Sequence, residues 1–139
     1  MEEREAVIRR WFEMWLRGDA RGVEDIFTED AVYIESWGPE YHGVGKIRHW
    51  FCEWNARGTV LRWDIGQSFH RDDRTAAAWR FQDRMDDGRT EAFDGMSLVR
   101  WDAQGRIACL QEFGCNADRY DPYRDGPEPK FREGPAAWF

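Results

Sequence analysis

The sequence predicts an α+β fold in which three N-terminal helices pack on a curved antiparallel sheet and form a cone-shaped α+β barrel, open at one end. Apolar residues recur at helical spacing up to Arg57, whereas the segment from Thr59 to Cys115 consists of long β-rich runs. The chain of 139 residues is 16% aromatic, with 9 Trp and 9 Phe. Its length and ring content favour a single domain with one core.

The N-terminal part of the chain predicts three helices. From Glu5 to Arg17 the apolar residues recur at steps of three and four, which describes one face of a helix. Asp19 can cap a short second helix, after which the polar residues 28–30 predict a turn. A third helix is predicted from about Val44 to Arg57. The helices and the sheet should together bury six rings, namely Trp11, Trp15, Trp50, Trp54, Phe81 and Phe93.

A short β-rich run, AVYIES at residues 31–36, separates the second and third predicted helices. Alternation along this strand places Tyr33, Glu35 and Trp37 on one face. A carboxylate between two large rings costs stability unless a partner or a ligand uses it. We therefore expect Glu35 to face a closed pocket lined by aromatic side chains.

The second half of the chain predicts an antiparallel meander, with strands at Thr59 to Arg71, Arg74 to Met85, Thr90 to Trp101 and Arg106 to about Cys115. A three-residue loop over residues 86–88 pairs Phe81 with Phe93 and Arg80 with Asp94, whereas a two-residue turn would place Arg80 opposite Gly95. We expect the first register, because it joins ring to ring and charge to opposite charge. It directs Trp79, Phe81, Phe93, Gly95, Ser97, Val99 and Trp101 towards the helices, and Arg80, Gln82, Arg84, Asp94, Met96 and Leu98 outwards.

Composition and charge argue against several classes of function. The formal net charge of −7 and the lack of a run of Lys and Arg argue against nucleic-acid binding. No window approaches the apolar run of a membrane helix, and the acidic N-terminus is unlike a targeting segment, so we expect a cytoplasmic protein with no membrane partner. The cysteines and the other potential ligands match no metal-binding spacing, so we predict reduced thiols, no metal and no cofactor.

Three segments resemble the nuclear transport factor 2 superfamily, and within it the SnoaL-like polyketide cyclases and the ketosteroid isomerases. They are VIRRWFEMWLRGDARGVEDIFTEDAVYIE, YHGVGKIRHWFCEW and FDGMSLVRWDAQGRIACLQEF. The resemblance covers roughly Ala6 to Asn116, so we expect a SnoaL-like domain at residues 1–116 and a C-terminal tail at 117–139. Because this superfamily hosts isomerases, cyclases, dehydratases and binding modules on one scaffold, the resemblance implies the fold and leaves the activity open.

By this resemblance, Glu35 stands where ketosteroid isomerases keep the carboxylate that moves a proton between carbons. Burial between rings would raise its pKa towards the value that suits a general base near neutral pH. The alternative is a rim glutamate that pairs with an arginine or caps the third helix. His42, at the end of the same loop, is a candidate for shuttling protons or binding a carboxylate, and a solvated or backbone-bonded histidine is its alternative.

The resemblance also implies an oxyanion site, which ketosteroid isomerases build from a protonated aspartate and a tyrosine. The corresponding positions here are Ser97 and Trp11. A neutral hydroxyl and an indole each donate one hydrogen bond but are weaker partners for an oxyanion, so steroid isomerase activity is not expected. SnoaL-like cyclases also carry an aspartate at the Ser97 position. The alternative for Trp11 is a residue of the core.

Glu112, in the run LQEFGC, is the second candidate carboxylate. The resemblance directs it into the cavity beside Leu110, but alternation by itself could equally bury Phe113 and expose Glu112. If Glu35 and Glu112 both point inward, their pKa values would separate and supply an acid and a base from one residue type. Otherwise Glu112 is a surface charge that faces an arginine.

The leading hypothesis is a cofactor-free isomerase, cyclase or dehydratase that acts on an apolar, ring-bearing substrate with Glu35 as general base. Glu112 and His42 are its further catalytic candidates. The alternatives are a non-catalytic ligand-binding module and a dimerisation module whose cavity is incidental. The residues predicted to contact the ligand are Trp11, Tyr33, Trp37, Tyr41, Trp54, Trp63, Trp79, Phe81, Phe93, Ser97 and Leu110.

The expected partners are a small apolar molecule in the pocket and a second copy of the chain. Met96 and Leu98 lie among arginines on the outer face of the predicted sheet, a mixture suited to a homodimer contact. The tail at 117–139 is polar and interrupted by prolines, so no helix is predicted there. Its last two rings, Trp138 and Phe139, are expected to dock on the domain or on the dimer partner.

Overall fold

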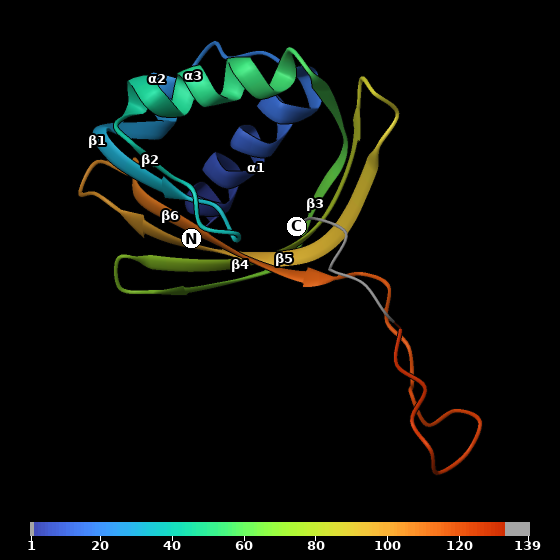
Figure 1. The fold of residues 1–139 in the computed structure, drawn as a ribbon. Coiled ribbons are helices and arrows are strands. Elements are labelled where there is room, and N and C mark those ends of the chain that lie inside the picture. The colour runs from blue at the N-terminus through green and yellow to red at the C-terminus, as the bar shows by residue number, and fades with distance from the viewer. Residues whose placement is uncertain (1, 133–139) are drawn as a thin grey trace.

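The computed structural model describes residues 2–132 of the chain. Its helices are α1 (Glu2–Arg17), α2 (Val23–Ile26) and α3 (Val44–Asn55), and its strands are β1 (Phe27–Ile34), β2 (Glu40–His42), β3 (Gly58–Arg71), β4 (Arg74–Met85), β5 (Thr90–Trp101) and β6 (Ile107–Asn116). The fold is α+β, as predicted. The helices lie on the concave side of a strongly curved sheet, with α1 crossing inside the curve and α3 above it (Figure 1).

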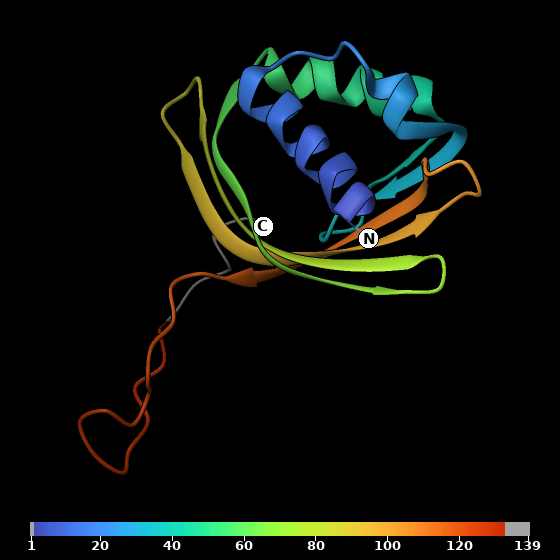
Figure 2. The ribbon, with the colours of Figure 1, turned by 180° about the vertical axis from the view of Figure 1, so that it is seen from behind.

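The sheet has six strands in the order β2-β1-β6-β5-β4-β3 and does not close. Strand β1 runs parallel to β6, while the other neighbouring strands are antiparallel, so the prediction of an antiparallel sheet is wrong at this junction. The physical reason is topological. Helix α3 carries the chain from β2, at one edge of the sheet, to β3 at the other edge, and the meander β3 to β6 returns to β1, as the view from behind shows (Figure 2).

The predicted register between β4 and β5 is confirmed, because Phe81 pairs with Phe93 and Arg80 with Asp94. The loop at residues 86–88 places Gly88 at a φ of 92°, a left-handed conformation that glycine adopts without steric cost. The Met85 amide donates to the Arg89 carbonyl at 2.7 Å and closes the loop. The inner and outer faces of these two strands therefore follow from the turn.

Helix α1 fills the concave face of the sheet with rings. Phe12 stacks on Trp63 of β3 with ring centroids 4.0 Å apart. The six rings are mostly buried, as predicted: Trp11 and Trp15 lie in the core, and the other four are partly buried and pack against it. Those four, Trp50, Trp54, Phe81 and Phe93, also border a cavity.

Two predicted boundaries are wrong around β1. Residues 28–30, predicted as a turn, belong to the strand. The strand then ends at Ile34, because the Glu35 amide donates to the Pro39 carbonyl at 2.9 Å and the Gly38 amide to the Glu35 carbonyl at 3.1 Å, which closes a turn. Trp37 stands in that turn and is 61% exposed, so it does not share the buried face of Tyr33.

The segment 117–132 contains turns and bends but no helix or strand, and it leaves the domain at the end of β6 (Figures 1 and 2). An ion pair between Arg119 and Asp94, 3.0 Å apart, links its start to β5. Trp138 and Phe139, whose docking is predicted, lie outside the described residues. Within residues 2–132, no helix is long and apolar enough to cross a membrane.

Candidate functional site

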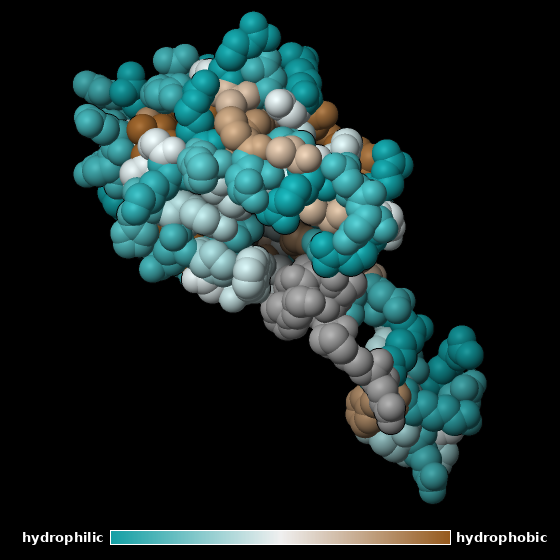
Figure 3. Space-filling view, turned by 45° about the horizontal axis from the view of Figure 1, so that its top comes forward, coloured by the Kyte–Doolittle hydropathy of each residue, from teal (hydrophilic) through white to brown (hydrophobic). Residues whose placement is uncertain are grey.

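A cavity of about 800 Å³ lies between α3 and the concave face of the sheet. Its walls combine many rings with several carboxyl groups. The lining rings are Trp15, Trp37, Tyr41, Trp50, Trp54, Trp63, Trp79, Phe81 and Phe93; the acids are Glu35, Glu53, Asp83, Glu91 and Glu112; the bases are Lys46, His49, Arg57 and Arg89; Ser36 and Met85 complete the lining. The space-filling view tilts the α3 side of the molecule forward and shows hydrophobic atoms between mostly hydrophilic ones (Figure 3).

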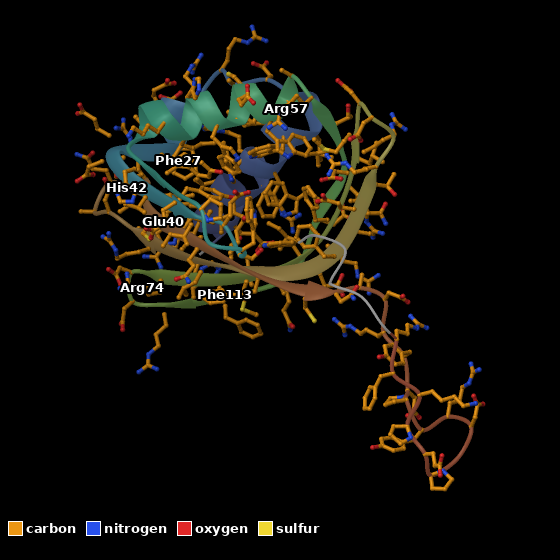
Figure 4. All side chains as sticks on the ribbon, in the orientation of Figure 1. Phe27, Glu40, His42, Arg57, Arg74 and Phe113 are labelled. Carbon is orange, nitrogen blue, oxygen red and sulfur yellow. The ribbon has the colours of Figure 1, made fainter. Side chains whose placement is uncertain are left out.

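Glu112 points into this cavity from the inner face of β6. Leu110 is fully buried on that face. Phe113 is 50% exposed and extends below the sheet, on the side away from the helices (Figure 4). The Tyr33 hydroxyl donates a 2.6 Å hydrogen bond to Oε2 of Glu112. Loss of solvent raises the pKa of Glu112 to about 8, against the lowering effect of that hydrogen bond. The carboxyl group is therefore mainly protonated at neutral pH.

Glu35 borders the same cavity from the turn after β1. Its Oε2 accepts a 2.8 Å hydrogen bond from the Tyr41 hydroxyl of β2. Burial raises the pKa of Glu35, while hydrogen bonds from Tyr41 and Trp37 oppose that rise by favouring the carboxylate. Glu35 forms no ion pair with any of the described residues. The structure therefore does not support the alternative of a rim glutamate that pairs with an arginine.

The two glutamates form one electrostatic unit. Burial raises the pKa of Glu112, and the negative charge of Glu35 raises it further. Burial is also the largest cause of the raised pKa of the Tyr41 hydroxyl, and the charges of both glutamates add to that rise. Each carboxyl group receives its hydrogen bond from a different tyrosine, Tyr33 or Tyr41. One side of the cavity thus holds two acids of unequal environment, each fixed by a phenol that keeps its proton.

A second carboxyl pair faces the cavity from the meander. Asp83 on β4 lies directly opposite Glu91 on β5. Asp83 is 2% exposed, and its Oδ1 has no hydrogen-bond partner among the described residues. Burial, followed by the charge of Glu91, raises the pKa of Asp83 to about 7. The charge of Glu91 also contributes to the raised pKa of Glu35, so the two carboxyl pairs interact electrostatically.

Several residues predicted to contact a ligand lie behind the cavity wall. Trp11 is fully buried and packs against Tyr33, with ring centroids 5.9 Å apart. Ser97 is also buried, and its Oγ accepts a 2.9 Å hydrogen bond from the Trp79 indole. Trp11, Tyr33, Ser97 and Leu110 are absent from the lining, so the structure does not bring the predicted Trp11 and Ser97 donors to the cavity.

His42 does not reach the cavity either. It is exposed at the end of β2, with its Nε2 3.6 Å from Glu40, and lies at the edge of the molecule opposite the Arg57 end of α3 (Figure 4). The solvated histidine is therefore the reading that the structure favours. The remaining predicted ligand contacts, Trp37, Tyr41, Trp54, Trp63, Trp79, Phe81 and Phe93, all line the cavity together with Glu35 and Glu112.

Sequence reasoning missed Asp83 and Glu91, although a signal for them existed. The register that pairs Phe81 with Phe93 also pairs Asp83 with Glu91 and directs both inward. Trp15 and Trp50 were expected in the core, and they reach the cavity because α3 stands off from the sheet. In the described part of the chain, no three His, Cys, Asp or Glu side chains gather as a metal site.

Comparison with known proteins adds a family and a set of similar folds. The family model of the SnoaL-like domain matches residues 8–110. A search of curated protein sequences gave no match.

Solved structures with similar folds share little sequence with this chain. A putative isomerase from Bacillus subtilis has a TM-score of 0.72 and 14% identity, covering 82% of this chain and 87% of that one. An LEH-like epoxide hydrolase from M. tuberculosis has a TM-score of 0.73 and 12% identity, with coverage of 83% and 84%. A protein of ketosteroid isomerase-like fold from Catenulispora acidiphila, in complex with trimethylamine, has a TM-score of 0.69 and 16% identity, with coverage of 77% and 83%. At these sequence identities, the similarity supports the fold and nothing more specific.

Proposed function

The chain belongs to the SnoaL-like domain family, and on that premise we propose that its cavity performs cofactor-free proton transfer on a small, largely apolar molecule. The reaction class is isomerisation, cyclisation or dehydration, each of which can begin by removing a proton from a carbon next to a carbonyl. Glu35 is the base in this proposal. Glu112 is the neutral acid that faces the same ligand.

The observation that carries the proposal is the pair of unlike carboxyl groups on one wall of a ring-lined cavity. Burial raises the pKa of both groups, but hydrogen bonds from Tyr41 and Trp37 to Glu35 oppose the rise and favour its ionised form, whereas the pKa of Glu112 is raised to about 8, which favours its protonated form. Environments that push two titratable groups apart in this way assign the base and the acid. The surrounding rings exclude water and strengthen both interactions.

The chemistry balances without any further reactant. The carboxylate of Glu35 takes a proton from the carbon and becomes a neutral acid. The electron pair of the C–H bond forms a C=C bond, and the π pair of the carbonyl moves onto its oxygen. Oε2 of Glu112 is held by the Tyr33 hydroxyl at 2.6 Å, which leaves the other oxygen of the protonated group to donate a hydrogen bond to that developing enolate. Return of the proton from Glu35 to another carbon completes an isomerisation.

Exchange of carbon-bound hydrogen for deuterium tests this step without knowledge of the natural substrate. The protein is incubated in heavy water with a panel of cyclic ketones and enones, and mass spectrometry measures deuterium uptake. We expect uptake for a subset of the panel, its loss in Glu35→Gln and a decrease of about tenfold to a thousandfold in Glu112→Gln. Glu13→Gln, which changes an exposed glutamate of α1, is the matched control and should behave as the wild type.

Two outcomes would contradict the proposal. If uptake persists undiminished in Glu35→Gln, this residue is not the base. If compounds of the panel bind, as measured by quenching of tryptophan fluorescence, but no compound exchanges, the ligand-binding module becomes the better description of the cavity.

A further inference from the structure

We propose that the wall formed by Asp83 and Glu91 binds the ammonium group of a cationic amine, while the adjacent rings hold its apolar body. This inference deepens the proposed function by naming a ligand class, and it rests on that function only in taking the cavity as a ligand site. It concerns the carboxyl pair on β4 and β5, for which the proton-transfer step has no use.

The geometry of this pair favours a cation, because without one the Asp83 and Glu91 side chains relieve their repulsion only by sharing a proton in a hydrogen bond. Asp83 and Glu91 are directly opposite each other on neighbouring strands, an arrangement that is unfavourable for two like charges. Asp83 is 2% exposed, and its Oδ1 has no hydrogen-bond partner among the described residues. A buried carboxyl oxygen without a donor costs stability, so rotation of the Asp83 carboxyl group towards a donor that enters with a ligand would recover that cost.

The basic side chains of the cavity do not fill this role. Arg57 pairs with Glu53 at 3.1 Å, and Arg89 pairs with Asp87 at 2.8 Å, all four side chains being largely exposed. The charge of Arg89 does lower the pKa of Asp83, but it is the weakest of the causes, and burial together with Glu91 raises that pKa to about 7. Among residues 2–132, no ion pair joins Asp83 or Glu91 to a basic side chain.

The rings beside the pair suit a cation as well as an apolar body. Phe81 and Phe93 are the next inward-facing residues on the same two strands, with ring centroids 4.9 Å apart. Trp63 packs edge-on against Phe81 at 5.2 Å, and Trp54 lines the cavity from α3. Aromatic faces attract ammonium groups, most strongly where water is excluded. An anionic ligand would be repelled by the carboxyl groups, and a neutral ligand would leave them uncompensated.

A matched pair of probes tests the proposal. Benzylamine is protonated at about pH 7.5 and so carries a positive charge and N–H donors, and ethylbenzene is its neutral carbon isostere. Tryptophan fluorescence and calorimetry measure the binding of each to the full chain at about pH 7.5. We expect the cation to bind at least about tenfold more tightly than the isostere, a ratio that corresponds to about 1.4 kcal/mol.

Variants locate the charge that discriminates. In Asp83→Asn combined with Glu91→Gln, the two probes should bind within about twofold of each other, and the affinity for the neutral isostere should stay at the wild-type value, which also shows that the pocket is folded. Each single substitution should give an intermediate ratio. Glu35→Gln removes a carboxyl group of the other pair and should keep most of the preference for the cation.

The outcomes separate this inference from the proposed function. Equal binding of the two probes to the wild type, or a preference that survives in the double variant, overturns the inference and leaves proton transfer in place. Loss of the preference in Glu35→Gln instead assigns the cation to the other carboxyl pair and equally overturns it. If neither probe binds, the cavity is no site for small apolar molecules, and the inference and the proposed function fail together.

Discussion

Replacing Glu112 with glutamine should make the protein more stable at neutral pH, by an amount that depends on pH in a defined way. Glutamine keeps the shape of the side chain and an oxygen that can accept the Tyr33 hydroxyl, but it cannot ionise. The pKa of Glu112 is 4.5 before burial and about 8 in the folded protein. A raised carboxyl pKa means that the folded state holds a proton that the unfolded state releases.

The sign and size of the effect follow from this difference. Below about pH 4.5 the carboxyl group is protonated in both states and costs nothing. As pH rises towards about 8, folding requires a proton to be retained, and stability falls by about 1.4 kcal/mol for each pH unit. By about pH 7 the loss reaches about 2–3 kcal/mol, since partial contact with solvent screens some of it. Glu112→Gln removes this loss.

Urea unfolding at several pH values measures the prediction. The difference in free energy of unfolding between Glu112→Gln and the wild type should be near zero at about pH 4 and grow to about 2–3 kcal/mol in favour of the variant at about pH 7. Glu13→Gln, at an exposed position of α1, controls for the loss of one negative charge. A difference that is constant with pH, or a variant that is less stable at about pH 7, would refute the buried, protonated Glu112.

Three further predictions follow from other parts of the structure. Glu35→Gln should abolish deuterium exchange and raise stability modestly near neutral pH, because its pKa is also raised by burial; a destabilised variant would indicate a charged partner instead. Gly95→Ala should lower stability by about 1–3 kcal/mol in thermal unfolding, because a Cβ there would lie 2.3 Å from the Trp79 ring; unchanged unfolding would contradict that packing. Light scattering should give twice 16.6 kDa for the wild type and a monomer for the double substitution of Met96 and Leu98 by lysine; a monomeric wild type would rule out the dimer.

The sequence was a good guide wherever local rules decide the structure. The bounds of β4 and β5 were predicted to the residue, because alternation and the loop at residues 86–88 act over short distances. The parallel pairing of β1 with β6 joins segments about eighty residues apart, as in the pair of Tyr33 with Leu110, and no local pattern encodes it. Trp37 was misplaced because a turn already begins at Glu35.

The candidate site was predicted in part for the same reason. Glu35 and most of the rings at the cavity follow from alternation and from the family resemblance, whereas Trp11 and Ser97 occupy positions that the resemblance assigns to donors but lie in the core. Alternation along a strand predicts whether a side chain points inward or outward. Whether it meets a neighbour or an open cavity depends on how far α3 stands from the sheet, which is a property of the whole fold.

The orientation of Glu112 shows why alternation left one question open. On β6 either Glu112 or Phe113 had to face inward, and a hydrophobic ring is ordinarily the buried choice. The structure turns Phe113 outward, where it pairs with Met96 of β5 and is 50% exposed. This outward ring joins Met96 and Leu98 in one apolar area on the outer face of the sheet, which is the surface expected to meet a second copy of the chain. The inward glutamate and the outward phenylalanine thus have a common cause: β6 supplies a carboxyl group to the ring-lined cavity on one side and a ring to an apolar surface on the other.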